Sequence, residues 1–254
     1  MLLKVKDKTT LAYSVRSVRH RLPDGRETDI HIAKYNRGST KARFVVFKRP
    51  DSLLNWCQQN EVSDAINAGF FSWENNIPLG ETWVGGEIYN HTPFMDPWSK
   101  IRGCLDINDN YLQIAPRSQI TRPRNMVQTG PILLSNGKVV LKETIDNEGF
   151  STGSSQFDAD LTMGRYPRTA IGYNDEFVWS IVCDGYSTKN AGLTLYELAL
   201  FLKELGMRYA LNLDGGGSST LISSYRVVNS PFALEHYYPA GRPIHSAIIF
   251  EPFA

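Results

Sequence analysis

The sequence predicts an α+β fold of one domain, rich in β-structure, with a mixed sheet and a C-terminal strand–helix–strand unit that carries the candidate site. Short apolar runs broken by Gly, Pro and Asn fill the middle of the chain and favour strands. A single helical stripe lies near the C-terminus between two apolar runs of strand length. Because residues 1–254 contain no repeat and no linker, we expect them to form a single domain.

The first third of the chain is predicted to contain a hairpin and a short helix. β-rich runs within 28–48 flank the turn-forming sequence at 37–40, which indicates two paired strands. Residues 52–60 are typical of a short helix. Further short strands are expected over 82–88, 101–107, 111–114 and 131–134.

A polar segment separates these strands from the C-terminal unit. Residues 145–165 are dense in Ser, Gly, Asp and Asn and hold few large apolar residues. A connection of this length inside a domain is usually either functional or mobile. We therefore expect either a lid or a disordered loop there.

The C-terminal unit begins and ends with a strand, predicted at 177–183 and 209–213. The strand–helix–strand connection makes the two strands parallel, so Asp184 and Asp214 are expected at the same edge of the sheet. If the strands are direct neighbours, the two carboxylates lie about 5–10 Å apart, the range that glycosidases use. One intervening strand would double that gap.

The helix of this unit is predicted from its apolar stripe and its first turn. Thr194 followed by Glu197 fits a capping box, which we favour over a catalytic role for this acid. The helix ends at Gly206. Its apolar stripe consists of Leu195, Leu198, Ala199, Leu202 and Leu205.

The turn that follows Asp214 indicates chemistry most clearly. Glycine costs about 0.5–1 kcal/mol relative to alanine in an ordered element, so three in succession suggest a positive φ or a close approach. The amides of Gly215, Gly216 and Gly217 are candidate donors to a phosphoryl oxygen. The hydroxyls of Ser218 and Ser219 add further polar contacts. A tight structural loop is the alternative. The lysine and spacing of a P-loop are absent.

Three further polar residues are candidate substrate ligands. Arg168 is predicted to grip a phosphate through its guanidinium fork, although most arginines are surface charges. Asn212 lies two residues before Asp214 and shares its strand face. Asn67 either contacts substrate or has a structural role.

Composition restricts the function classes. The 27 basic and 26 acidic residues give a formal charge of +1, so we expect neither duplex nucleic acid nor a membrane as partner. No run approaches the ~20 apolar residues of a membrane span, and the N-terminus lacks the apolar core of a signal peptide. We therefore expect a cytoplasmic protein.

Cys57, Cys104 and Cys183 are odd in number and widely spaced, which predicts reduced thiols. No metal site is encoded locally, so we expect no cofactor, with a divalent metal left open.

Together these motifs resemble the phosphodiester glycosidase family. They cover most of residues 30–250 in the family's order. The matching stretches are NAGFF at 67–71, QTGPILLSNGK at 128–138, RTAIG at 168–172, VCDG at 182–185, GLTLYELALFLKELG at 192–206 and ALNLDGGGSSTL at 210–221.

The resemblance implies a mixed α+β fold and hydrolysis of a glycosyl phosphodiester, with a small-molecule glycosyl phosphate or a phosphorylated glycan as the partner. It also implies a site around Asp184, Asp214 and the glycine-serine turn. The family often has glycine where this chain has Ala68 and arginine where it has Tyr186. That phosphate contact is then lost or is supplied by Arg165 or Arg168.

Three functions remain as hypotheses. In the first, the chain cleaves a sugar-1-phosphodiester. Arg168 and the glycine amides would hold the phosphate, and Asp184 and Asp214 would share the general acid/base or nucleophilic roles. In the second, prompted by Tyr186, it binds a phosphorylated sugar or nucleotide without turnover. In the third, it is a nucleotide phosphodiesterase, in which the phosphorus atom is attacked.

Overall fold

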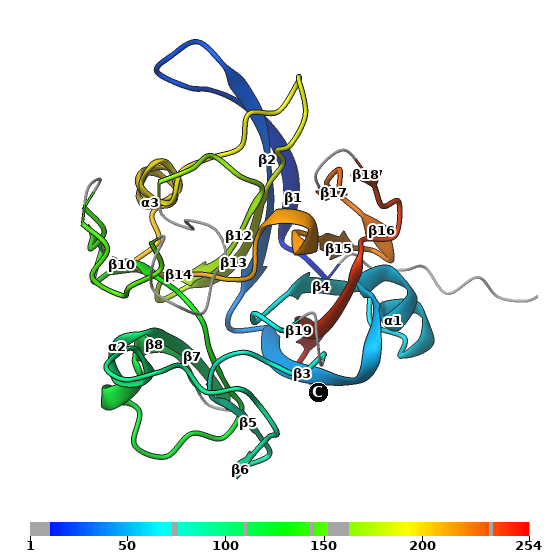
Figure 1. Ribbon diagram of the computed structural model, residues 1–254. Helices are drawn as coiled ribbons and strands as arrows, with labels where there is room; N and C mark the ends of the chain where they lie inside the picture. The colour runs from blue at the N-terminus through cyan, green and yellow to red at the C-terminus, as the bar shows by residue number, and fades with distance from the viewer. Residues whose placement is uncertain are drawn as a thin grey trace, which may run out of the picture.

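The computed structural model describes residues 11–72, 76–108, 111–142, 145–151, 163–233 and 236–253. These residues form a β-rich fold of three sheets, a two-stranded ribbon and few helices (Figure 1). Every pairing between the described strands of these sheets is antiparallel. The prediction of a mixed sheet is therefore wrong.

The first sheet holds seven strands and carries the C-terminal unit. Helix α3 (Leu195–Glu204) packs on one face of it (Figure 1). The strands, in spatial order, are β1 (Ser14–Arg21), β2 (Glu27–Asn36), β13 (Phe177–Cys183), β12 (Arg168–Tyr173), β14 (Tyr209–Asn212), β10 (Ile132–Ser135) and β11 (Lys138–Val139).

The second sheet holds five strands, and helix α1 (Leu53–Gln59) packs against it (Figure 1). Its strands, in order, are β16 (Arg226–Val227), β15 (Leu221–Ser223), β4 (Asp64–Asn67), β19 (Pro243–Pro252) and β3 (Thr40–Ser52).

The third sheet also holds five strands. They are β6 (Glu87–Ile88), β5 (Thr82–Val84), β9 (Met126–Gln128), β7 (Gly103–Asn108) and β8 (Tyr111–Pro116). The remaining elements are α2 (Trp98–Ile101), the 3₁₀ turns η1 (Arg117–Gln119) and η2 (Gly216–Ser218), and the ribbon of β17 (Phe232–Ala233) with β18 (His236–Tyr237).

One apolar core joins the three sheets. Leu211 of the first sheet, Ile66 of the second and Leu105 of the third are all fully buried within it. Tyr35 of the first sheet stacks on Phe250 of the second, with ring centroids 3.8 Å apart. Each large apolar side chain buried in this way contributes about 1.5–3 kcal/mol. The three sheets therefore hold the site segments in fixed positions.

The predicted hairpin within 28–48 is wrong, although both of its strands form. β2 pairs with β1 and β13 in the first sheet, whereas β3 pairs with β19 in the second. The turn at 37–39 thus connects two sheets. Both strands have longer partners elsewhere, and a local turn sequence does not reveal this.

Several local predictions are confirmed. Helix α1 forms within the predicted range 52–60. The capping box of α3 is present, with the Thr194 hydroxyl accepting from the Glu197 amide and the Glu197 carboxylate accepting from the Thr194 amide. Cys57, Cys104 and Cys183 are free, buried thiols.

The structure describes only part of the segment 145–165, which was predicted to be a lid or a disordered loop. Residues 152–162 of the predicted lid or loop lie outside the described residues. None of the helices in the described part of the chain is long and apolar enough to cross a membrane.

Candidate active site

The strands that precede Asp184 and Asp214 end at the same edge of the first sheet but do not touch. β12 lies between β13 and β14 and is antiparallel to both, so β13 and β14 are parallel to each other. The predicted parallel orientation is confirmed, and of the two alternatives left open the structure shows the one with an intervening strand. Alternate strands are separated by roughly 9–10 Å. Helix α3 therefore connects two strands, β13 and β14, that have β12 between them in the sheet. β12 precedes both of these strands in the chain.

Asp184 follows β13 and is buried, with its side chain 2% exposed. Its Oδ2 lies 3.0 Å from His31 Nε2, and the His31 ring in turn contacts the Ser17 hydroxyl at 2.8 Å. Its Oδ1 accepts from the Ser230 amide at 3.0 Å and from Asn229 Nδ2 at 3.4 Å. The Asp184 carboxylate is therefore surrounded by hydrogen-bond partners, and it holds the segment of Asn229 and Ser230 in place.

Asp214 has different surroundings. Its side chain is 16% exposed, and its Oδ2 lies 3.9 Å from Arg242 Nη2. Burial raises the pKa of Asp214 to about 6, and Arg242, the Ser218 hydroxyl and the Gly215 amide oppose the shift. A carboxyl group with this pKa changes its charge near neutral pH, which is a property of groups that transfer protons or react.

The backbone of Asp214 is held by the second sheet. The Asp214 amide donates to the Ala68 carbonyl at 2.8 Å, and its carbonyl accepts from Asn67 Nδ2 at 2.6 Å. Asn67 Oδ1 accepts from the Thr169 hydroxyl and the Thr220 amide, each at 3.0 Å. Asn67 is thus buried and positions Asp214, and a contact of Asn67 with substrate stays a prediction.

Arg242 is the functional candidate that the sequence did not reveal. It directly precedes β19, and its Nη2 and Nε donate to Ser218 Oγ at 2.6 and 3.1 Å. The Ser218 hydroxyl also bonds to Asp214, so it bridges the acid and the arginine. Arg242 reaches the site through the antiparallel pairing of β19 with β4. Because this pairing joins segments far apart in the chain, the sequence around Arg242 does not indicate a functional role.

The glycine turn shows both features that its composition predicted. Gly216 has a φ of +58°, and a Cβ on Gly215 would lie 2.9 Å from the Pro167 carbonyl oxygen. The prediction that the Gly216 amide donates to a phosphoryl oxygen is wrong, because this amide donates to the Pro167 carbonyl oxygen at 2.9 Å. Gly217 is buried within η2. The turn therefore fits tightly against the start of β12 and presents Ser218 to Arg242.

Two of the predicted polar ligands are buried with an unpaired oxygen. Asn212 donates through Nδ2 to the Gly130 carbonyl at 2.8 Å, while its Oδ1 has no partner among the described residues. The Ser219 hydroxyl likewise lacks a partner within the described chain. Contacts of either residue with substrate stay predictions.

The arginines that the sequence singled out hold the framework of the site. Arg168 is 3% exposed and donates to the carbonyls of Leu193 at 2.9 Å and Gly164 at 2.6 Å. Arg165 pairs with Glu197, with Nε 2.9 Å from Oε2, and also with Asp24. These two guanidinium groups bind Leu193, Gly164, Glu197 and Asp24, whereas Arg242 binds Ser218 and lies beside Asp214.

Tyr186 lies over the glycine turn. Its backbone has a φ of 56°, a left-handed conformation that is uncommon outside glycine, asparagine and aspartate. Its hydroxyl would lie 3.5 Å from a Cβ on Gly216. The Tyr186 ring meets that of Tyr166 edge-on, with centroids 6.0 Å apart. Two aromatic rings therefore border the surface beside Asp214.

A comparison with protein families decides the relationship of this chain. The family model for phosphodiester glycosidases matches residues 60–251. The chain belongs to the phosphodiester glycosidase family. The resemblance that the motifs indicated is thereby confirmed.

Three relatives of this chain are named N-acetylglucosamine-1-phosphodiester alpha-N-acetylglucosaminidase. The mouse protein is 26% identical over 169 residues, which are 66% of this chain and 33% of the mouse sequence. The bovine protein is 26% identical over 189 residues, 72% of this chain and 35% of its own. The human protein is 25% identical over 170 residues. This chain thus spans about a third of the length of these relatives.

Solved structures share the fold. The catalytic domain of the zebrafish N-acetylglucosamine-1-phosphodiester alpha-N-acetylglucosaminidase, auto-inhibited by its pro-peptide, superposes with a TM-score of 0.70 at 18% identity. The match covers 93% of this chain and 81% of that domain. A hypothetical protein from Synechocystis gives a TM-score of 0.68 at 16% identity, covering 93% of this chain and 61% of the other.

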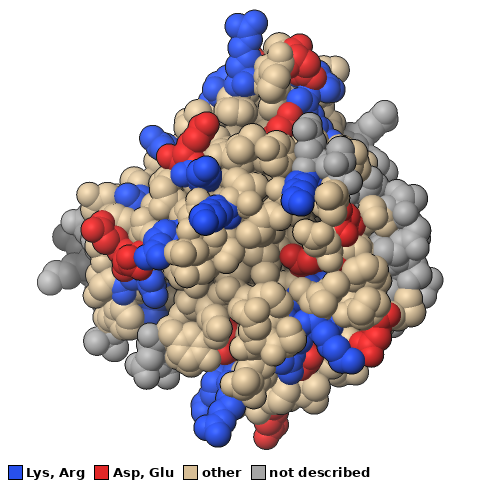
Figure 2. Space-filling view, turned by 90° about the vertical axis from the view of Figure 1, so that its left-hand side faces the viewer, with Lys and Arg blue, Asp and Glu red and all other residues tan. Residues whose placement is uncertain are grey.

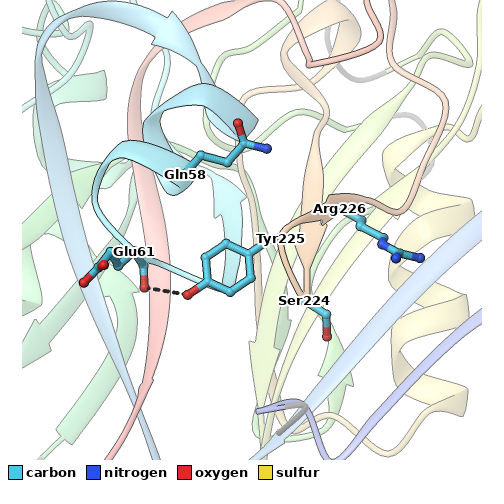
Figure 3. Close-up of a pocket in the computed structure, with 5 residues that line it drawn as sticks. All are labelled: Gln58, Glu61, Ser224, Tyr225 and Arg226. Carbon is cyan, nitrogen blue, oxygen red and sulfur yellow. Dashed lines mark hydrogen bonds between the residues drawn. The ribbon is translucent and has the colours of Figure 1, made fainter. Parts of the chain in front are cut away.

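A separate hollow of this family member lies away from Asp214. It is lined by Gln58, Glu61, Ser224, Tyr225 and Arg226, at the end of α1 and the β15–β16 turn (Figure 3). The Tyr225 hydroxyl donates to the Glu61 carbonyl at 3.0 Å across it. None of the predicted site residues lines this hollow, so the candidate active site remains the surface around Asp214.

Charges and metal-ligating groups are dispersed in the described part of the chain. On the face drawn in Figure 2, Lys and Arg are interspersed with Asp and Glu. Within the described residues, no group of three His, Cys, Asp or Glu side chains is placed to hold a metal ion. Beside Asp214, the structure places the guanidinium group of Arg242.

Proposed function

We propose that this chain hydrolyses a glycosyl phosphodiester and releases the sugar from the phosphate. The observation that carries the proposal is the Asp214–Ser218–Arg242 arrangement, which pairs a partly exposed carboxyl group with a guanidinium group. Membership of the phosphodiester glycosidase family supports it, as do the names of the mouse, bovine and human relatives.

Arg242 binds the substrate phosphate in this proposal. A guanidinium fork offers two parallel donors to the non-bridging oxygens of a phosphate group. Ser218 Oγ accepts from Arg242 Nε and Nη2, so the arginine is oriented before substrate arrives. The positive charge comes from the protein, and we propose that no metal ion is needed for binding.

Asp214 acts on the anomeric carbon as a carboxylate, either directly or through a water molecule that it deprotonates. The bond between the anomeric carbon and the phosphate oxygen breaks, and its electron pair stays on that oxygen. Addition of water gives a free sugar and a phosphate monoester. Because a phosphate is already a good leaving group, a second acid that protonates it is unnecessary, in contrast to ordinary glycosides.

Asp184 has a positioning role in the proposal. Its carboxylate fixes Asn229 and the Ser230 amide, and Asn229 donates to the Ser219 carbonyl at 3.0 Å. This chain of contacts supports the glycine turn from the interior. The proposal therefore replaces the shared roles of the two acids with one reactive and one supporting aspartate.

Hydrolysis in oxygen-18 water tests the proposal. The panel holds a glycosyl phosphodiester, a nucleotide sugar and a nitrophenyl glycoside, each with and without EDTA. We expect cleavage of a glycosyl phosphodiester, unaffected by EDTA, with the label in the sugar. Label in the phosphate would instead identify a phosphodiesterase. Calorimetric binding without any product would identify a binding protein.

A further inference from the structure

Tyr186 lies over the glycine turn, and the backbone there is tightly packed and takes an uncommon conformation. A Cβ on the preceding Gly185 would lie 2.7 Å from the Pro167 nitrogen, and Tyr186 itself takes a φ of 56°. A non-glycine residue in this region is strained. The surrounding structure maintains that conformation, and it places the phenol beside Gly216 and the ring against Tyr166.

Two arginines that keep their charge, Arg168 and Arg242, lie near this phenol, and both donate hydrogen bonds to groups of this chain. Arg242 faces Asp214, whereas Arg165 is paired with Glu197 and Asp24. Arg168 lies below Tyr166, with its guanidinium 5.1 Å from the ring centroid, and donates to two backbone carbonyls. Burial is the main cause that raises the pKa of Tyr186, so its phenol is neutral at physiological pH.

We propose that Tyr186 determines the ligand class of the site: it favours the single charge of a phosphodiester over the double charge of a phosphate monoester, and its ring contacts the attached sugar. This inference rests on the proposed function. Tyr186 is exposed over 36% of its surface, which leaves a ring face for a ligand. Sugar rings present apolar C–H faces that pack on aromatic side chains.

The proposal has a consequence for the reaction. A diester carries one negative charge, whereas a monoester carries about 1.5 to 2 at neutral pH because its second pKa is near 6. Cleavage therefore raises the charge of the bound phosphate beside the Asp214 carboxylate. Arg168 and Arg242 already donate hydrogen bonds within the chain, and the neutral phenol adds no further positive charge for the product. The site therefore binds the substrate better than the phosphate product and releases that product.

Calorimetric titration tests the selectivity without turnover. The protein carries D214N, and the two probes are a sugar 1-phosphate and its methyl diester at pH 8, which differ by one charge and one methyl group. Three changes are added in turn: Y186R, which supplies a second cation, Y186F, which keeps the ring, and Y186A, which removes it. Y13R is the control, since Tyr13 is 67% exposed and lies near the opposite end of β2.

We expect Y186R to tighten the monoester roughly 10- to 100-fold, the range of one charge-assisted hydrogen bond, and to change diester affinity less than about threefold. Y186F should keep the preference for the diester, and Y186A should weaken diester binding about tenfold. Y13R should change neither. Unchanged relative affinities in a folded Y186R would overturn the inference.

The inference and the proposed function fail separately. If unmutated protein cleaves glycosyl phosphodiesters but Y186R leaves the relative affinities unchanged, the role of Tyr186 is wrong and the function stands. If the Y186R shift appears but unmutated protein shows no turnover, the hydrolase is wrong and the ligand selectivity stands.

Discussion

Asp184 and Asp214 follow parallel strands at one edge of the same sheet, yet they have opposite surroundings. Asp184 is 2% exposed and is enclosed by His31, Asn229 and the Ser230 amide. Asp214 is 16% exposed, lies beside Arg242 and has a pKa raised to about 6. An enclosed carboxylate with satisfied oxygens stabilises structure, whereas a partly desolvated one keeps the capacity to react.

Asp184 and Asp214 differ in their surroundings because different segments of the chain cover them. The chain at 229–230 closes over Asp184, while the start of β19 brings only one arginine to Asp214. Equivalent positions in the strand pattern therefore do not give equivalent chemistry. Four predictions test this difference, in order of decreasing expected effect.

The first prediction concerns loss of the reactive acid. D214N should lower kcat/KM for a glycosyl phosphodiester at least about a thousandfold, because an amide neither attacks carbon nor deprotonates water. Folding should not suffer. Since the pKa of Asp214 is raised in the folded state, its ionisation destabilises the fold as pH rises from about 4 to 6. Removing the charge should then leave Tm at pH 8 equal or higher.

Activity assays and thermal melts check this first prediction. D175N is the matched control, since the Asp175 side chain is 83% exposed and lies in the β12–β13 turn, at the opposite end of these strands from Asp184. Activity of D214N within tenfold of the unmutated protein would show that Asp214 is not the reacting group.

The second prediction concerns Arg242. R242Q should lower kcat/KM about 10- to 100-fold through loss of a charge-assisted contact with phosphate. R242K should recover only part of this, because an ammonium group lacks the planar fork. R208Q, at a side chain that is 45% exposed, is the control. Steady-state kinetics measure the effect, and an unchanged KM and kcat in folded R242Q would exclude a phosphate contact.

The third prediction is the pH dependence of the unmutated protein. If Asp214 reacts as a carboxylate, kcat/KM should fall about tenfold per pH unit below its pKa of about 6 and level off above it. A pH profile from 4.5 to 8.5 with a diester substrate, whose own charge is constant over this range, measures this. A rate that falls above pH 6 would assign Asp214 the role of general acid.

The fourth prediction concerns the enclosed acid. D184N should reduce the free energy of unfolding by about 1–3 kcal/mol, because the Ser230 amide and Asn229 lose a charged acceptor. Activity measured well below Tm should change less than about tenfold. Denaturant unfolding beside the D175N control checks the loss. A D184N protein as stable as the original but inactive would restore Asp184 as a catalytic residue.

Local sequence patterns predicted much of the framework of the site. The capping box at Thr194, the strands before Asp184 and Asp214, and the tight glycine turn all form as expected. Each depends on neighbours within a few residues, such as an alternation of side chains or a positive φ. Patterns of this kind are visible in one sequence because their causes are local.

Strand partners and burial were not predicted in the same way. The insertion of β12 between β13 and β14 made the sheet antiparallel and separated the two acids. Arg242 reaches Ser218 only because β19 pairs with β4 in another sheet. A single sequence contains no periodicity that specifies such partners, because they depend on which apolar faces pack together.

The sequence by itself determined the family, the two aspartates, the helix between their strands and the turn that needs glycine. The tertiary structure alone decided which aspartate is enclosed, which arginine faces the other, and where the Tyr186 ring lies. The physical reason is that burial and charge pairing arise between segments far apart in the chain. Those contacts set the pKa of Asp214 and the positive charge available to a phosphate.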